Sequence, residues 1–175
     1  YFLWNEGQGP VHDLTKILAQ DPANPPYGPP GAFHHWGEPL FGYYQQTDRY
    51  VLRKHMQMLA DAGVDVLCLD VTNAFTYDSV RDALLAVLDE MKAAGMRTPA
   101  IAFLANSHSA RTVEHLYQTF YKPGKGRAHW FHWLGKPLLL TPPDGLSEEV
   151  KGFFTIRHSW AWTKGHQWFG DGRDK

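Results

Sequence analysis

The most constraining feature of this sequence is a helix, a glycine and an apolar strand that follow one another twice in the same order. Apolar residues at helical spacing over 47–62 precede Gly63 and the β-branched and aliphatic run 64–69. The same pattern returns over 76–105, around Gly95. Glycine suits the left-handed residue that closes a helix, and short apolar runs are typical of strands buried on both faces. The repeat predicts a parallel α/β fold with right-handed crossovers.

Further elements are predicted on both sides of this repeat. Thr47 can cap the first helix, and Thr76 or Asp78 can cap the second. The first helix is expected to turn Val51, His55, Met58, Leu59 and Ala62 inward, and the second Val80, Leu84, Val87, Leu88 and Met91. The other predicted elements are a strand over 1–4, helices over 13–19, 109–121 and 146–151, strands over 137–141 and 153–157, and a hairpin around Gly135.

The strand count predicts how the domain is organised. The chain of 175 residues is read as one domain spanning 1–175, with five strands joined by four crossovers. It begins inside an expected strand and stops in a polar loop, so we expect a truncated piece. The predicted fold class is α/β, a partial (β/α)8 TIM barrel of about the first five βα units. An open flavodoxin-like sheet is the alternative, and strand order discriminates between the two.

Several classes of function are excluded or disfavoured by composition and motifs. The formal net charge of -1 provides no basic footprint for nucleic acid, and no apolar run reaches the roughly 18 residues that a membrane span needs. The single cysteine, Cys68, permits no internal disulfide. No glycine-rich phosphate loop and no GxSxG elbow is present, and the adjacent His34 and His35 lack the spacing of a zinc site. We therefore expect no cofactor and no metal.

Polar and aromatic residues follow the predicted strands, where a parallel α/β fold places its active site. Aromatic residues make up 14% of the chain, and 10 histidines accompany them. Aromatic faces stack on sugar rings while Asn, Asp and His bind the hydroxyls, so the pattern favours a carbohydrate site. Asp70 is the main catalytic candidate and Glu6 the second. The expected substrate-binding residues are Trp4, Asn5, His34, His35, Trp36, Asn73, Asn106, His108, Trp160 and Trp162.

Each of these residues also has a structural interpretation. Asp70 can simply anchor a loop, and the segment 106–108 can cap the helix that follows it. The side chains of residues 34–36 can pack inside a loop and stabilise it. His55 is expected to be a hydrogen-bonded core histidine, and Cys68 a buried, unreactive thiol.

An ordered set of short motifs resembles a known family. The set comprises His35-Trp36, Gly42-Tyr43-Tyr44, Thr47-Asp48, Val51 to Met56, Asp61 to Leu67 and the turn Gly135-Lys136-Pro137. It is similar to the N-terminal half of the glycoside hydrolase family 99-like proteins, (β/α)8 barrels related to endo-acting α-mannosidases and mannanases. The resemblance implies a carbohydrate-active hydrolase acting on a glycan or polysaccharide, in a secreted or periplasmic setting. It also implies that the main catalytic acids lie beyond residue 175.

Two other functions remain open at this point. One is a glycan-binding barrel without catalysis. The other is a different barrel hydrolase or lyase that uses His35 or His108 as general base, because histidine titrates near neutrality.

Overall fold

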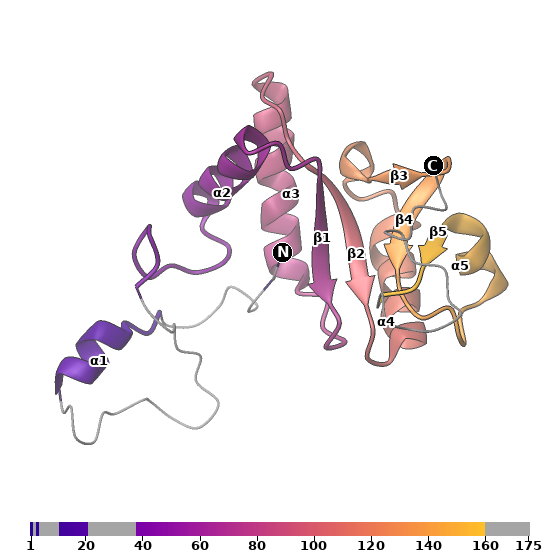
Figure 1. The fold of residues 1–175 in the computed structure, drawn as a ribbon, viewed down its shortest axis with the longest axis horizontal. Coiled ribbons are helices and arrows are strands. Elements are labelled where there is room, and N and C mark those ends of the chain that lie inside the picture. The colour runs from indigo at the N-terminus through magenta and orange to yellow at the C-terminus, as the bar shows by residue number, and fades with distance from the viewer. Residues whose placement is uncertain (2, 4–10, 21–37, 160–175) are drawn as a thin grey trace.

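The structure is a computed structural model that describes residues 1, 3, 11–20 and 38–159, and it shows a mixed α/β fold with a partly parallel sheet (Figure 1). In chain order the elements are α1 (Leu14–Gln20), α2 (Arg49–Asp61), β1 (Val66–Val71), α3 (Asp78–Ala93), β2 (Ala100–Ala105), α4 (Ser109–Leu116), the π-helix η1 (Tyr117–Tyr121), the 3-10 helix η2 (Arg127–His129), β3 (His132–Trp133), β4 (Lys136–Leu140), α5 (Glu148–Phe153) and β5 (Thr155–Arg157).

The three parallel strand pairings follow chain order. Strand β1 pairs in parallel with β2, β2 with β4, and β4 with β5, whereas β3 forms the predicted hairpin with β4. Tyr1 lies beside the remaining side of β1: its ammonium nitrogen donates to the Cys68 carbonyl at 2.7 Å, and the Asp70 amide donates to the Tyr1 carbonyl at 3.0 Å. The order therefore runs in one direction without the reversal of a flavodoxin-like sheet.

The main core lies on one face of this sheet. Leu69, Phe103 and Leu139 point into it from three neighbouring strands, and the helices α2 to α5 all contribute to the same cluster. The opposite face carries a smaller cluster around Ala102, Leu138 and Leu140, to which none of the described helices contributes. Helices on one face only are what crossovers of one hand produce when the strand order does not reverse.

Helix α2 differs from its prediction in both its start and its inward face. Asp48, not Thr47, is the N-cap, and its carboxylate accepts hydrogen bonds from the amides of Tyr50 and Val51. Met58 is 50% exposed, and Ala62 is exposed and lies at the C-cap, so the inclusion of both in the inward stripe is wrong. The buried residues of the helix are Val51, Leu52, Met56 and Ala60. Helical spacing counted from Val51 selected Met58 and Ala62, whereas the packing of α2 against α3 buries the i, i+4, i+8 series that starts at Leu52.

Helix α3 buries all five residues predicted for its inward stripe, but neither predicted cap occupies the N-cap. That position is Tyr77, in the left-handed region at φ 47°, and it makes no side-chain cap bond. The Thr76 hydroxyl donates to the Asp78 carboxylate at 2.6 Å instead. Strand β1 also runs to Val71, so Asp70 lies within the strand rather than after it.

The predicted helix over 109–121 is two elements. Regular α-helix ends at Leu116, and the chain continues as η1, where the Lys122 amide donates to the Tyr117 carbonyl five residues back. This wider turn places Phe120 and Tyr121, which are consecutive, both in the core at 0% and 2% exposure. The sequence pattern over 109–121 predicts one regular helix and carries no signal for this wider turn.

Candidate functional site

The carboxyl ends of β1, β2, β4 and β5 lie at one edge of the sheet, because these strands are parallel. Backbone contacts hold the first loops of this edge together: the Ser107 amide donates to the Thr72 carbonyl at 2.8 Å. Farther along the edge, the Ser159 hydroxyl lies 3.4 Å from the Asn106 amide oxygen. Asp70, Asn73, Asn106 and His108, the predicted site residues that the structure describes, are all at or just beyond this edge.

Asp70 is half-buried and has both a structural role and a free acceptor. Its Oδ1 accepts hydrogen bonds from the Thr72 amide at 2.9 Å and from the Thr72 hydroxyl at 2.7 Å, which is the loop-anchoring role. Its Oδ2 makes no hydrogen bond or ion pair to any residue that the structure describes. One carboxylate oxygen is thus without a partner in the part of the chain that the structure describes.

Asn73 and His108 are placed differently from each other. The Asn73 amide nitrogen donates to the Tyr77 hydroxyl at 2.6 Å, and its oxygen accepts from the Phe75 amide at 3.2 Å, so its side chain shapes the β1–α3 loop. His108 is exposed and is the N-cap of α4 at φ 46°, without a side-chain cap bond. The cap predicted for 106–108 is therefore made by backbone, and the imidazole stays accessible.

Left-handed backbone is concentrated at this edge. Three of the four non-glycine residues with positive φ among the described residues lie here: Ala74 at 68°, Tyr77 at 47° and His108 at 46°. Such conformations cost about 1–3 kcal/mol each and are found disproportionately at ligand sites. The β1–α3 loop is thus held in a shape that its residues do not prefer.

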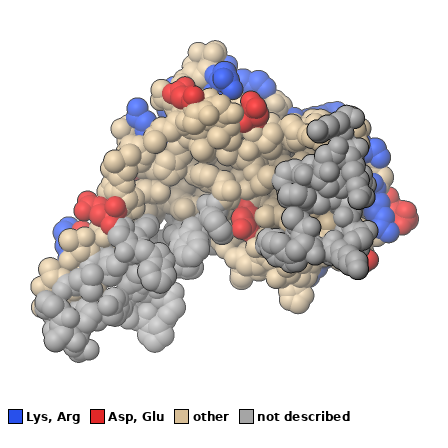
Figure 2. All heavy atoms as spheres, viewed as in Figure 1, with Lys and Arg blue, Asp and Glu red and all other residues tan. Residues whose placement is uncertain are grey.

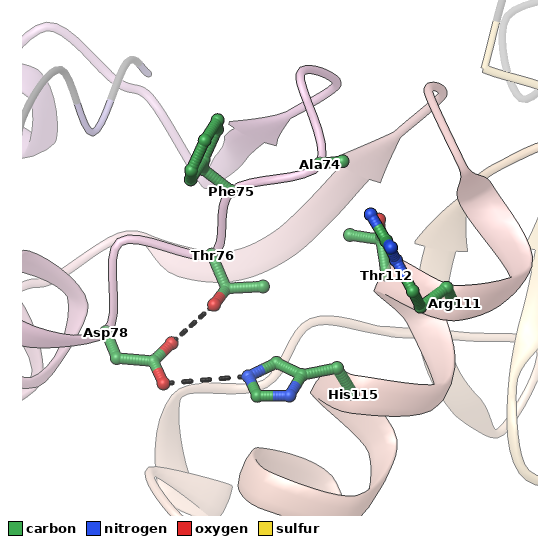
Figure 3. A pocket seen from close by; sticks show the side chains of 7 residues that line it. All are labelled: Ala74, Phe75, Thr76, Asp78, Arg111, Thr112 and His115. Carbon is green, nitrogen blue, oxygen red and sulfur yellow. Dashed lines mark hydrogen bonds and ion pairs between the residues drawn. The ribbon is translucent and has the colours of Figure 1, made fainter.

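This strained loop and the first turns of α4 enclose a pocket of about 400 Å³ (Figure 3). Phe75 is 61% exposed at its rim, and Arg111 and His115 come from α4. Arg111 has no side-chain partner among the described residues. Sequence reasoning missed all three, because they meet only when the loop after β1 packs against the helix after β2.

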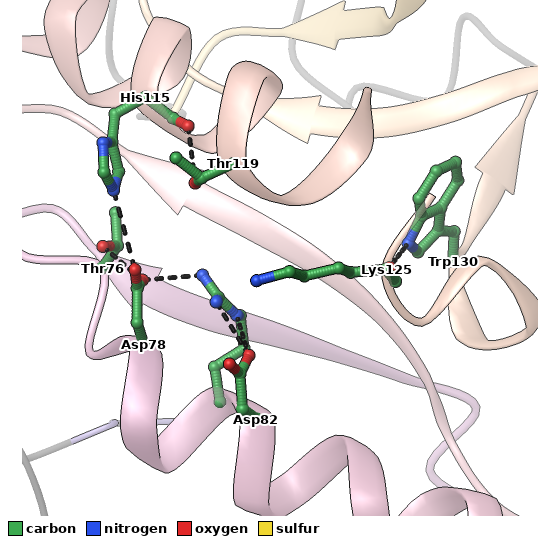
Figure 4. A network of polar contacts seen from close by, with 8 residues as sticks. Thr76, Asp78, Asp82, His115, Thr119, Lys125 and Trp130 are labelled. Atoms are coloured by element: carbon green, nitrogen blue, oxygen red, sulfur yellow. Dashed lines mark hydrogen bonds and ion pairs between the residues drawn. The ribbon is translucent and has the colours of Figure 1, made fainter. Parts of the chain in front are cut away.

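A charged network links Asp78 and His115, which line this pocket, to the buried Arg81 (Figure 4). Asp78 lies 3.7 Å from the Nε2 of His115 and accepts from the buried Arg81 guanidinium at 2.7 Å. Burial alone would raise the pKa of Asp78, but the hydrogen bond from Thr76 and the positive charge of Arg81 together outweigh it, and the pKa is lowered. Asp78 is therefore ionised at ordinary pH, and the positive charge of Arg81 compensates its negative charge.

Sequence reasoning also missed Arg157. The pairing register aligns Asp70 with Leu104, Leu104 with Leu140, and Leu140 with Arg157, so these four side chains form one row on the sheet face opposite the helices. Arg157 is 8% exposed. In the sequence, an arginine at the end of an apolar run indicates only that a strand leaves the core there. The strand register is needed to show that Arg157 belongs to this row.

The remaining predicted site residues lie outside the described residues. They are Trp4, Asn5, Glu6, His34, His35, Trp36, Trp160 and Trp162.

The two residues predicted to be structural behave unequally. The Nδ1 of His55 lies 3.1 Å from the Tyr1 hydroxyl, and burial lowers the pKa of His55, as expected for a neutral, hydrogen-bonded histidine. Cys68 is only half-buried, although burial still raises the pKa of its thiol. Its expected full burial is wrong because it faces the smaller cluster rather than the helical core.

The surface of the described chain is of mixed charge. The face shown in Figure 2 carries acidic and basic side chains interspersed over a largely uncharged surface. Within 1, 3, 11–20 and 38–159, no three His, Cys, Asp or Glu residues are grouped so that they could hold a metal ion. None of the described helices has the length and apolar character to cross a membrane.

Comparisons with known proteins give structural likeness only. Neither a protein-family model nor a curated protein sequence matches the chain. Two solved structures of a GH99 endo-α-mannosidase from Bacteroides thetaiotaomicron are similar in fold. The complex with bis-tris-propane is 20% identical with a TM-score of 0.46, over 61% of this chain and 33% of that one. The second is 18% identical with a TM-score of 0.45, over 67% and 38%. The chain thus spans little more than a third of these structures.

Proposed function

We propose that the chain forms about the first five βα units of a (β/α)8 barrel whose carboxyl edge binds and hydrolyses a glycan or polysaccharide. The unreversed strand order and the helices on one face support the barrel. A singly wound sheet of this kind closes when further βα units continue the same turn. The motif set that resembles the family 99-like barrels supports the substrate class.

The observation that carries the proposal is the placement of Asp70. It is a half-buried carboxylate at the carboxyl edge of a parallel sheet, and only one of its oxygens is bonded within the described chain. Burying a charge is costly without partners, so a carboxylate kept here points to a ligand that it binds. A sugar hydroxyl supplies a donor suited to the second oxygen.

Glycoside hydrolysis generally needs two carboxyl groups. One donates a proton to the departing glycosidic oxygen, and the other activates water or attacks the anomeric carbon. Asp70 would provide one charged group, as acid, base or hydroxyl anchor. Its partner is proposed among the acids outside the described residues, Glu6 or acids beyond residue 175. Asn106 and Ser159 would bind hydroxyls beside it, and Phe75 would offer an aromatic face to a sugar ring.

The test compares four variants of the full-length protein. Asp70→Ala and Asp70→Asn remove the charge, and Thr72→Val removes the hydroxyl bond to Asp70 but keeps the carboxylate. Asp65→Ala, at an exposed aspartate just before the same strand, is the matched control. Binding to soluble mannans and other polysaccharides is measured by calorimetry, and hydrolysis by the release of reducing ends.

The proposal expects both Asp70 variants to lose hydrolysis and to bind at least about tenfold more weakly, the loss of one hydrogen bond to a charged group. Thr72→Val and Asp65→Ala should retain both activities. Retention of binding and turnover by Asp70→Ala would overturn it, as would the absence of any polysaccharide binding by the native protein. Binding without turnover by the native protein would overturn the proposed hydrolysis and support a glycan-binding barrel without catalysis.

A further inference from the structure

A second pocket lies at the opposite, amino-terminal edge of the sheet. It has a volume of about 410 Å³ and is enclosed by the turn after η1, the start of the β3–β4 hairpin and the end of α5. Lys136 and Pro137, which line it, begin β4, whereas Asp70 lies near the end of the parallel strand β1. The pocket is thus remote from the carboxyl edge and plays no part in the proposed glycan chemistry.

The charged groups that line this pocket are all basic. Lys122, Arg127 and Lys136 border it, and no aspartate or glutamate does. Lys122 forms an ion pair with Glu149 at 3.2 Å, but Arg127 and Lys136 have no side-chain partner among the described residues. Two uncompensated positive charges and a third shared one converge on one concave site, which stabilises a bound anion.

The wall between these charges is apolar and fixed. Trp130 is 8% exposed, and its indole nitrogen donates to the Lys125 carbonyl at 2.9 Å, so the ring is held in place. Phe153 packs edge-on to Trp130, with ring centroids 6.2 Å apart. The pocket therefore offers an organic group a surface to rest on, which a site for a free inorganic ion does not need.

The two turns that border the pocket are built on glycines with left-handed backbone. Gly124 has φ 77° and Gly135 has φ 83°, and a side-chain carbon added at either one would meet no atom within 4 Å. Both turns thus leave open space beside the basic side chains. Space, charge and an apolar wall coincide at this edge.

We propose that this pocket binds a sulfate or phosphate ester carried on a compact organic group. The tetrahedral oxyanion presents several oxygens at once, which suits the guanidinium fork of Arg127 together with the ammonium groups of Lys136 and Lys122. The organic group rests against Trp130 and Phe153. The site is independent of the glycan site, so either can exist without the other.

The test uses phenyl phosphate and phenyl sulfate as probes, with phenol as the uncharged counterpart. Binding to the full-length protein is followed by calorimetry and by ligand-observed NMR. The pocket variant is Arg127→Gln with Lys136→Gln, both at exposed positions. The matched control is Arg97→Gln with Lys151→Gln, which removes one arginine and one lysine outside the pocket.

At least one ester should bind the native chain, and the pocket variant should weaken it by about tenfold or more, since hydrogen bonds to charged groups are lost. The control should change affinity by less than about twofold, because neither residue lines the pocket and the interactions of exposed charges are screened by salt. The tighter ester identifies whether sulfate or phosphate is the preferred group.

Three results would overturn the proposal. They are the absence of binding by both esters, equal weakening in the pocket and control variants, and phenol binding as tightly as the esters. Circular dichroism of both variants shows whether they keep the native fold.

Discussion

The buried guanidinium of Arg81 offers the sharpest test of how charge is accommodated in this fold. Its side chain is 0% exposed and lies over the ring of Phe120, 5.0 Å from the centroid. It donates to Asp78 at 2.7 Å and to Asp82 at 2.7 and 2.9 Å. The two acids are 45% and 50% exposed, so water reaches them and does not reach the arginine.

This difference in exposure predicts that Arg81→Met lowers the unfolding free energy of the native protein but raises that of a variant lacking both acids. Asp78→Ala with Asp82→Ala leaves a buried charge unpaired, which costs about 3–5 kcal/mol of unfolding free energy. Arg81→Met alone leaves two half-exposed acids that regain water, so it costs about 1–2 kcal/mol, mainly the lost cation–π contact and charged hydrogen bonds. Adding Arg81→Met to the double variant removes the unpaired charge and should restore about 1 kcal/mol or more.

Urea unfolding followed by far-UV circular dichroism measures the four proteins of this cycle. The three substituted proteins should unfold with the same dependence on urea as the native chain, so that the midpoints report stability alone. An equal cost of Arg81→Met in both backgrounds would refute the reasoning, because the buried charge would then not be what the two acids stabilise.

Three further outcomes are expected. The lowered pKa of Asp78 stabilises the fold above its unfolded value of 3.8 and ceases to do so as pH falls through the lower folded value. The difference in unfolding free energy between the native chain and Asp78→Asn should therefore shrink between about pH 6 and about pH 2, and a constant difference would contradict it. The raised pKa of Cys68 should make its alkylation by iodoacetamide at about pH 8 slower than that of glutathione until urea unfolds the chain; equal rates would contradict it. Gly126→Ala places a side-chain carbon 2.5 Å from Leu85 at φ 61°, whereas Gly124→Ala meets nothing within 4 Å at φ 77°. Both should lose about 1 kcal/mol to backbone strain, and Gly126→Ala about 1 kcal/mol more to overpacking, which a thermal unfolding series would show or disprove.

The sequence was most informative where a single periodicity governs burial. The stripe from Val80 to Met91 lies inward as predicted, and the apolar runs that became β1 and β2 pair in parallel. The hairpin around Gly135 follows from a glycine between two apolar segments, and it forms. In each case the residue type and the required conformation agree.

Prediction was poorest where tertiary contacts override residue type. Tyr77 and His108 adopt left-handed backbone at helix starts, which neither residue type indicates. Arg81 and Arg157 are buried although arginine normally faces solvent. Asp70 lies at the carboxyl edge, as predicted, but the pocket at the same edge was not found, because Arg111 and the β1–α3 loop are neighbours only in the folded chain.

The wide turn of η1 has a consequence for how this fold tolerates changes in length. A π turn has the geometry of an α-helix into which one residue has been inserted. Deleting the exposed Gln118 would remove that extra residue and change which way Phe120 and Tyr121 point relative to the core. The same deletion would alter the path of the chain into Lys122, which lines the basic pocket.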